Sequence, residues 1–185
     1  IQNLALAAAW WRHQDLPDEA LGKAAHTFRI GRQRLESVAT VDGVAYWDDS
    51  KATNFHACEA ALAPIDGPGV WIGGGKSKGG DLAGFVSRIS PRICSAVLLG
   101  ETGPELADLF AARGVPVQVA SNLEDAVLHG RNRAQPGDAV VLSPGFSSLD
   151  QFDGYADRGE QFSGAVRKLL PPPVNCKNEN VQSRV

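Results

Sequence analysis

The pattern of apolar and polar residues changes character after about residue 35. Before it, an Ala- and Leu-rich segment from Asn3 to about Gln14 predicts one helix, and Asp18 to about His26 predicts a second. Two runs of strand-forming residues then flank Asp42-Gly43, the dipeptide that a type I′ hairpin turn favours. We therefore expect two helices followed by a β-hairpin, with strands at Glu36–Val41 and Val44–Trp47.

Beyond the hairpin, short and wholly apolar runs alternate with helical stretches. The apolar runs are typical of strands buried on both faces of a parallel sheet. They lie at Val70–Gly73, Ala96–Leu99, Val115–Ala120 and Ala139–Leu142. The helices are expected at Asn54–Leu62, Leu82–Ser87, Pro104–Arg113, Leu123–Ala134 and Tyr155–Leu170. This alternation predicts a Rossmann-like, doubly wound α/β domain with a mostly parallel sheet over residues 36–170. Residues 1–35 would precede that domain, and the polar residues 171–185 are predicted to be disordered.

Composition narrows the class of protein. A 185-residue chain with 43% hydrophobic and 21% charged residues is not disordered throughout. Its net charge of −3 lacks the basic excess of a nucleic-acid binder. No run approaches the ~20 apolar residues that span a bilayer, so we expect neither membrane insertion nor secretion. The three cysteines, Cys58, Cys94 and Cys176, form no disulfide framework or CxxC metal site, which favours a cytoplasmic protein.

The chain has no methionine and opens on Ile1 inside a predicted helix. We therefore expect it to be a piece of a longer protein.

Ligands of open α/β sheets bind beyond the carboxyl ends of the strands, so loops that follow strands are the places to search. The first such loop, Asp48–Asn54, concentrates two carboxylates, a lysine and two hydroxyls between a strand and a helix. Thr53 or Asn54 can cap that helix, whose free N–H groups favour an anion. On spacing alone, the alternative interpretation is a helix cap with solvated charges.

The second loop, Gly73–Asp81, invites comparison with the phosphate-binding P-loop because it contains Gly-Lys-Ser. The first glycine of that motif would fall on Val70, and Gly79 and Gly80 are poor residues for the first turn of a helix. The P-loop interpretation therefore fails. What is left is a flexible loop whose two lysines can hold phosphate or carboxylate, or alternatively a plain glycine turn.

The third loop, Ser143–Phe152, is followed by Tyr155 and Arg158-Gly159. Its hydroxyls and backbone N–H groups can grip a carboxylate or stabilise an oxyanion. A serine nucleophile is disfavoured because the chain has no GxSxG elbow. The histidines fit no catalytic triad and are interpreted as structural or solvated; they are His13, His26, His56 and His129.

Taken together, the three loops resemble the C-terminal domain of the Mur ligases. Asp48–Asn54 is similar to the [ND]DSKATN signature of the branch of that family that adds D-glutamate. Leu142–Phe162 is similar to the LSP…S[FL]DQF…[FY]…RG…F segment, and Gly74–Gly79 to the GG…KG loop. Asn3–Ala8 resembles the end of the helix HNxxNxLAA that closes the central ATPase domain. The resemblance covers about residues 3–170.

The resemblance implies an ATP-dependent ligase that uses ATP and Mg²⁺ to join D-glutamate to UDP-MurNAc-L-alanine through an acyl phosphate. Its P-loop and metal-binding residues would precede Ile1, with the protein's own N-terminal and central domains as partners, and no metal ligand would lie within this chain. Family matching assigns the D-glutamate site to Lys51, Thr53, Lys78, Ser148, Leu149 and Tyr155, with Lys51 and Lys78 as the catalytic charge partners. It assigns Asn3, Arg34 and Asp49 to ATP.

Two positions depart from the family pattern. The linker commonly reads PHR, whereas this chain has Arg32-Gln33-Arg34, and Phe146 stands where small residues are usual. Two alternatives stay open. One is another Mur-type or folate-type glutamate ligase, and the other is a non-catalytic α/β module that binds an anion or a partner domain.

Overall fold

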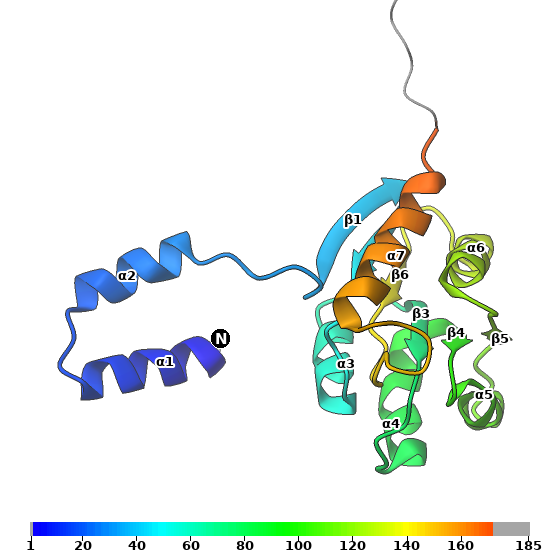
Figure 1. The fold of residues 1–185 in the computed structure, drawn as a ribbon, viewed down its shortest axis with the longest axis horizontal. Coiled ribbons are helices and arrows are strands. Elements are labelled where there is room, and N and C mark those ends of the chain that lie inside the picture. Colours follow the sequence, from blue (N-terminus) through cyan, green and yellow to red (C-terminus); the bar gives the residue numbers. More distant parts are fainter. Residues whose placement is uncertain (1, 172–185) are drawn as a thin grey trace, which may run out of the picture. The chain divides into compact units, whose positions relative to one another are not determined.

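A computed structural model describes residues 2–171, with side chains from residue 4 onward, and divides the chain into two compact units that meet between Arg32 and Gln33. The first unit contains helices α1 (Gln2–His13) and α2 (Asp18–Thr27), as predicted (Figure 1). Trp11 Nε1 donates to the Pro17 carbonyl at 3.0 Å, which fixes the turn between the helices. The second unit begins at Gln33, three residues before the predicted domain. The predicted disordered tail was residues 171–185, and residues 172–185 of it lie outside the described part.

Strands and helices alternate along the second unit. Its elements are β1 (Glu36–Val41), β2 (Val44–Asp48), α3 (Phe55–Leu62), β3 (Gly69–Gly74), α4 (Leu82–Ile89), the short helix η1 (Ser90–Arg92), β4 (Ile93–Leu99), α5 (Gly103–Ala111), β5 (Val117–Val119), α6 (Leu123–Arg133), β6 (Ala139–Leu142) and α7 (Tyr155–Lys168). Each predicted element is present. β3 and β4 extend beyond their apolar runs because the two strands pair along their whole length, from Gly69 opposite Ile93 to Gly74 opposite Leu99.

The six strands form one sheet in the order β1-β2-β6-β3-β4-β5. β1 pairs with β2 in antiparallel fashion, and all other pairs are parallel. Asp42 and Gly43 have φ values of 52° and 80°, as the predicted type I′ turn requires. The mostly parallel sheet with an N-terminal hairpin is therefore confirmed.

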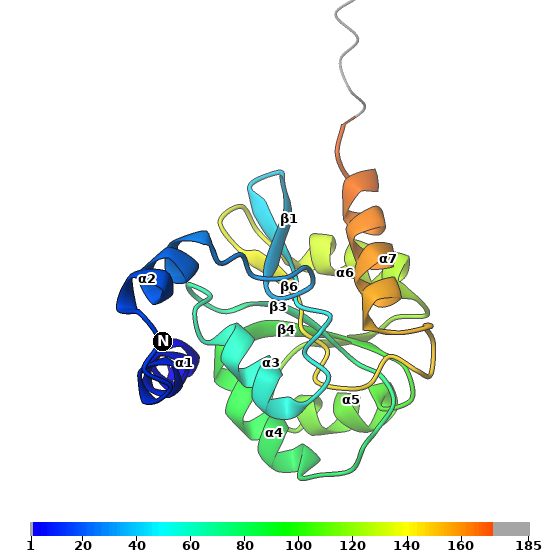
Figure 2. The same ribbon diagram turned by 60° about the vertical axis from the view of Figure 1, so that its left-hand side comes forward.

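Helices cover both faces of the sheet, which confirms the doubly wound arrangement (Figures 1 and 2). Side chains alternate between the faces along β3: Val70 and Ile72 pack with α6 and α7, whereas Trp71 packs with α3, α4 and α5. Both faces of the sheet therefore bury apolar side chains, so polar functional groups are expected in the loops at the ends of the strands. None of the described helices is long and apolar enough to cross a bilayer.

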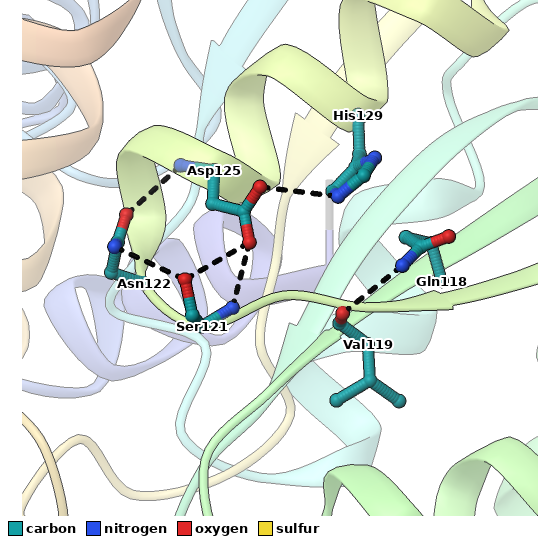
Figure 3. A network of polar contacts seen from close by, with 6 residues as sticks. All are labelled: Gln118, Val119, Ser121, Asn122, Asp125 and His129. Atoms are coloured by element: carbon teal, nitrogen blue, oxygen red, sulfur yellow. Dashed lines mark hydrogen bonds and ion pairs between the residues drawn. The ribbon is translucent and has the colours of Figure 1, made fainter.

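Exposed polar groups cap α6 (Figure 3). Asn122 accepts the Asp125 N–H at 2.9 Å, and Asp125 accepts the backbone and hydroxyl of Ser121 at 2.9 and 3.0 Å. These Ser121 hydrogen bonds hold the pKa of Asp125 below its usual range. His129 Nε2 lies 3.1 Å from Asp125 Oδ1, one turn earlier in the helix. This contact agrees with the interpretation of His129 as a structural residue. We call Ser121, Asn122, Asp125 and His129 the α6 cap network.

Candidate functional site

The three loops singled out in the sequence lie together because the strands that precede them are neighbours. β6 lies between β2 and β3, and all three run parallel, so their carboxyl ends share one edge of the sheet. Backbone hydrogen bonds tie the loops pairwise. The Gly145 N–H donates to Ala52 at 2.9 Å, and the Lys76 N–H donates to Ser147 at 2.9 Å. The sheet topology and these bonds make the three loops one structure.

Asp49 joins the linker to the third loop. Its Oδ1 accepts the Leu35 N–H at 3.1 Å, and its Oδ2 accepts the Ser143 hydroxyl at 2.7 Å. Burial raises the pKa of Asp49, and these two hydrogen bonds and the charge of Arg34 oppose that shift. Both carboxylate oxygens are thus held by donors of the domain itself, and the side chain is only 8% exposed.

Asp48 is more deeply buried, at 1% exposure. Its Oδ1 accepts the Ser50 N–H at 2.8 Å, whereas its Oδ2 is buried with no hydrogen-bond partner. Burial raises its pKa to about 6; the Ser50 hydrogen bond opposes this, and the nearby Glu36 charge adds to it. The two adjacent carboxylates of this loop therefore have different settings, although the sequence presents them as equivalent.

Arg158 joins the first loop to the third from inside the protein. Its guanidinium donates to the Ser50 hydroxyl at 2.9 Å, to the Ser50 carbonyl at 2.7 Å and to the Phe146 carbonyl at 3.3 Å. The side chain is 2% exposed, and burial lowers its pKa to about 10, against the opposing charges of Asp150 and Asp48. We call Arg158 and its partners Ser50 and Phe146 the Arg158 network.

The following residue, Gly159, lets α7 approach this loop closely. A Cβ there would lie 2.5 Å from Gln33 Cγ and 2.6 Å from Asp48 Oδ2. In the sequence, Arg158-Gly159 is part of a family-like motif that gives neither residue a role. The sequence did hold a signal for Arg158. This charged residue lies on the same buried helix face as Phe162 and Val166, and charged side chains are rarely buried without partners.

Lys51 and Tyr155 are brought together. The Lys51 ammonium lies 5.0 Å from the centroid of the Tyr155 ring, within the range of a cation–π contact. The Ser50 hydroxyl donates to the Tyr155 carbonyl at 2.8 Å, which fixes the start of α7 against the first loop. Two of the six residues assigned to D-glutamate therefore form a pair at the surface.

A second pair is formed by Thr53 and Lys78. Lys78 Nζ lies 3.4 Å from the Thr53 carbonyl. Asn54 caps α3 by accepting the Ala57 N–H at 2.9 Å, which confirms the predicted cap. A pocket of about 90 Å³ opens here, lined by Thr53, Asn54, Phe55, Lys78, Gly79, Gly145 and Phe146. We call it the Lys78 pocket.

Ser148 and Leu149 follow Phe146 in the third loop but are not among the residues that line the Lys78 pocket. Ser148 is 3% exposed, and its carbonyl accepts the N–H groups of Gln151 and Phe152 at 3.2 and 2.9 Å. Leu149 is 65% exposed. Just before them, the Ser143 carbonyl accepts the Trp71 indole N–H at 2.8 Å and the Cys58 thiol at 3.0 Å. The third loop is therefore anchored from below and presents Leu149 to solvent.

A fourth loop, which follows β4, is hydrogen-bonded to the glycine-rich loop. The sequence-based predictions did not include this contact. Thr102 accepts the Gly75 N–H at 3.2 Å and returns two hydrogen bonds to the Gly75 carbonyl. The sequence predicts a flexible glycine-rich loop. In the structure Gly73–Gly75 is buried and paired with neighbouring loops, whereas residues 76–80 are exposed. The signal was available, since Gly100-Glu101-Thr102 also follows a strand.

The residues assigned to ATP lie in both units. Arg34 is exposed on the linker, next to Gln33, whose carbonyl accepts the Lys51 N–H at 3.1 Å. Asn3 belongs to α1, and its side chain is outside the described part. Within residues 2–171, no group of three His, Cys, Asp or Glu side chains is arranged to hold a metal ion.

This mostly parallel sheet carries three loops with lysine or hydroxyl side chains at its carboxyl edge, and a known protein family matches most of the sequence that forms it. The sequence model of that family, described as "Mur ligase, glutamate ligase domain", matches residues 33–146. That is more than half of the chain, which therefore belongs to this family.

Two curated relatives carry the name UDP-N-acetylmuramoylalanine–D-glutamate ligase. The protein from Mycobacterium avium (strain 104) is 39% identical over 197 residues, and that from Mycobacterium tuberculosis (strain H37Rv) is 36% identical over 200 residues. Each match covers 89% of this chain and 40% of the relative. The chain thus spans about two fifths of the length of these relatives.

Solved structures show the same fold at low identity. UDP-N-acetylmuramate–alanine ligase from Thermotoga maritima superposes with a TM-score of 0.65 at 10% identity, over 91% of this chain and 37% of that protein. Folylpolyglutamate synthase from Mycobacterium tuberculosis, complexed with ADP, superposes with a TM-score of 0.57 at 17% identity. That match covers 85% of this chain and 36% of the synthase.

Proposed function

We propose that this chain is the amino-acid-binding part of an ATP-dependent ligase that joins D-glutamate to UDP-MurNAc-L-alanine in peptidoglycan synthesis. The observation that carries the proposal is the Asp48–Asn54 loop, whose sequence resembles the signature of the D-glutamate-adding branch and whose Thr53 lies beside Lys78 in a pocket. The names of the Mycobacterium relatives support the same choice of amino acid.

D-glutamate carries two carboxylates, so its site needs cations and hydrogen-bond donors that leave the amine free to attack. Lys51 and Lys78 supply the two positive charges, each from a different loop. Thr53, Ser148, Leu149 and Tyr155 complete the proposed site. With both carboxylates held, the amine would attack the acyl phosphate of UDP-MurNAc-L-alanine to form the amide and release phosphate.

ATP would supply the phosphoryl group that activates the carboxylate of UDP-MurNAc-L-alanine. The exposed guanidinium of Arg34 suits a phosphate oxygen. Asp49 fits a ribose hydroxyl less readily, because Leu35 and Ser143 already donate to its two oxygens. We propose that Asn3 contacts the adenine and that residues outside this chain hold Mg²⁺ and most of the phosphate contacts. Helices α1 and α2 would then belong to the central ATPase domain, and the enzyme would act in the cytoplasm.

The proposal is tested in the full-length protein that contains this chain. ATP and UDP-MurNAc-L-alanine are supplied with D-glutamate, L-glutamate, L-alanine, L-lysine or meso-diaminopimelate in turn, and phosphate release and product mass are measured. We expect turnover with D-glutamate. Preference for another amino acid would assign the chain to a sister or folate-type ligase, and no turnover with any of them would favour the non-catalytic module.

Lys78→Ala tests the site itself. Loss of a hydrogen bond to a charged group costs about 1.5–3 kcal/mol, so the KM for D-glutamate should rise about 10-fold to 160-fold. Lys76→Ala is the matched control, since Lys76 is an exposed lysine of the same loop that does not line the Lys78 pocket. Equal KM values for the two variants would show that Lys78 does not bind the amino acid.

A further inference from the structure

The Lys78 pocket has two kinds of wall. Thr53, Asn54 and Lys78 provide polar groups, whereas Phe55 and Phe146 provide aromatic rings. Lys78 is exposed as a residue and its ammonium lies 3.4 Å from the Thr53 carbonyl, whereas Phe146 is 3% exposed. A ligand that fills the pocket therefore needs an anionic group for the lysine and a short apolar segment for the rings.

The aromatic wall is locked in place. Phe55 stacks on Phe85 with ring centroids 4.4 Å apart and planes 13° from parallel. Phe146 meets both rings edge-on, at 5.3 Å from Phe55 and 6.0 Å from Phe85. Phe85 is wholly buried and also contacts Trp71. Because close-packed rings cannot shift without losing contacts on their other sides, this wall will not move aside for a longer ligand.

The backbone of Phe146 is held as firmly as its ring. Its carbonyl accepts two hydrogen bonds from Arg158, at 3.3 and 3.4 Å. The N–H of the preceding residue, Gly145, donates to the carbonyl of Ala52, which immediately precedes Thr53 in the first loop. The ring of Phe146 is therefore fixed relative to the loop that carries Thr53.

We propose that Phe146 determines the length of the acidic side chain that the ligase accepts. The methylene groups of the amino acid would lie against Phe55 and Phe146 while its side-chain carboxylate meets Lys78. An acid one methylene longer would then push either its chain into the Phe146 ring or its carboxylate away from Lys78. This inference rests on the proposed function, because it assumes that the incoming amino acid occupies the Lys78 pocket.

The test compares kcat/KM for D-glutamate with that for D-2-aminoadipate, which has one more methylene, in the full-length protein. One methylene in a fitted pocket is worth about 10-fold to 200-fold in specificity, so the wild type should prefer D-glutamate by at least about tenfold. In Phe146→Ala the ratio should fall about tenfold or more, because space opens beside Lys78. Phe146→Leu, which removes less volume, should give an intermediate ratio and serves if the alanine variant does not fold.

Phe110→Ala is the matched control. Phe110 is wholly buried in the same apolar cluster and contacts Trp71 at 5.5 Å, but it does not line the pocket. It should lose stability while keeping the wild-type ratio. A ratio that is unchanged in folded Phe146 variants, or that falls equally in Phe110→Ala, would overturn the inference while D-glutamate turnover still supports the proposed function. A wild type that does not use D-glutamate would overturn both.

Discussion

The Arg158 network and the α6 cap network are built from similar parts in opposite surroundings. Each centres on a charged side chain that bonds one serine through both its hydroxyl and its backbone: Ser50 for Arg158 and Ser121 for Asp125. Arg158 is 2% exposed, whereas the Asp125 side chain is 36% exposed. Burial is the main cause of the Arg158 pKa shift, and hydrogen bonds are the main cause of the Asp125 shift.

This difference shows what each network contributes. Water can replace the partners of an exposed charge, so the α6 cap network adds little beyond the geometry of one helix start. Water cannot reach Arg158 or its carbonyl partners, so losing any of them leaves polar groups buried and unpaired. The buried network therefore holds the first and third loops together through Arg158, which is 108 residues from Ser50 in the chain.

The largest expected effect comes from removing the buried charge. Arg158→Gln leaves the Ser50 and Phe146 carbonyls short of donors and Asp48 without its opposing charge, which should lower the free energy of unfolding by about 3–5 kcal/mol. Arg158→Lys keeps the charge but loses the planar fork, so a smaller loss of about 1–3 kcal/mol is expected. Urea unfolding of the 185-residue chain measures both. If both variants lost less than about 1 kcal/mol of unfolding free energy, the buried Arg158 network would contribute no more to stability than an exposed one.

An intermediate effect is expected at Asp48, beside the Arg158 network. Its folded-state pKa of about 6 is raised above the unfolded value, so the folded state binds the proton more tightly. That stabilising contribution is complete below about pH 4 and is lost as the pH rises through about 6, and it amounts to about 2–3 kcal/mol.

Asp48→Asn should abolish this dependence, because an amide does not ionise while its oxygen can still accept the Ser50 N–H. The free energy of unfolding of the wild type, relative to the variant, should therefore fall between about pH 4 and pH 7. Denaturant unfolding at a series of pH values measures the difference. Parallel profiles for the two proteins would show that Asp48 is not the titrating group.

The smallest effect is expected in the α6 cap network. His129→Gln removes the side-chain contact with Asp125 but leaves the Ser121 and Asn122 bonds in place. Because the pair is exposed, the thermal midpoint should not change measurably at either low or high salt. A clear, salt-dependent drop in the midpoint would mean that this exposed network contributes more than its surroundings suggest.

The fold could be predicted from the sequence because its signals are local. Continuous apolar runs such as Val70–Gly73 mark buried strands, Asp42-Gly43 marks the hairpin, and Asn54 marks a helix start. The meeting of the three loops also follows, once the sheet is known to be parallel. The positions of Lys51 and Lys78 at that edge were predictable in the same way.

The hydrogen bonds and ring contacts within the site were not predictable, because they join residues that are far apart in the chain. Nothing near Asp49 in the sequence shows that Ser143, 94 residues away, donates to it. The clamp of Thr102 on Gly75 and the stacking of Phe55 on Phe85 depend likewise on which loops the sheet brings together. For the same reason the sequence shows Phe146 only as a departure from the family pattern. Its contacts with Phe55 and Phe85 and its position in the pocket wall are seen only in the structure.

The hydrogen bond from Trp71 to the Ser143 carbonyl has a practical consequence. The indole is fully buried, whereas Trp10 is 61% exposed, so a quencher dissolved in the buffer will suppress the emission of Trp10 before that of Trp71. Trp71 contributes to the emission that survives, and its indole N–H donates to the carbonyl of the first residue of the third loop. The protein thus carries a natural fluorophore beneath its candidate site, and a movement of that loop can be followed optically without attaching a dye.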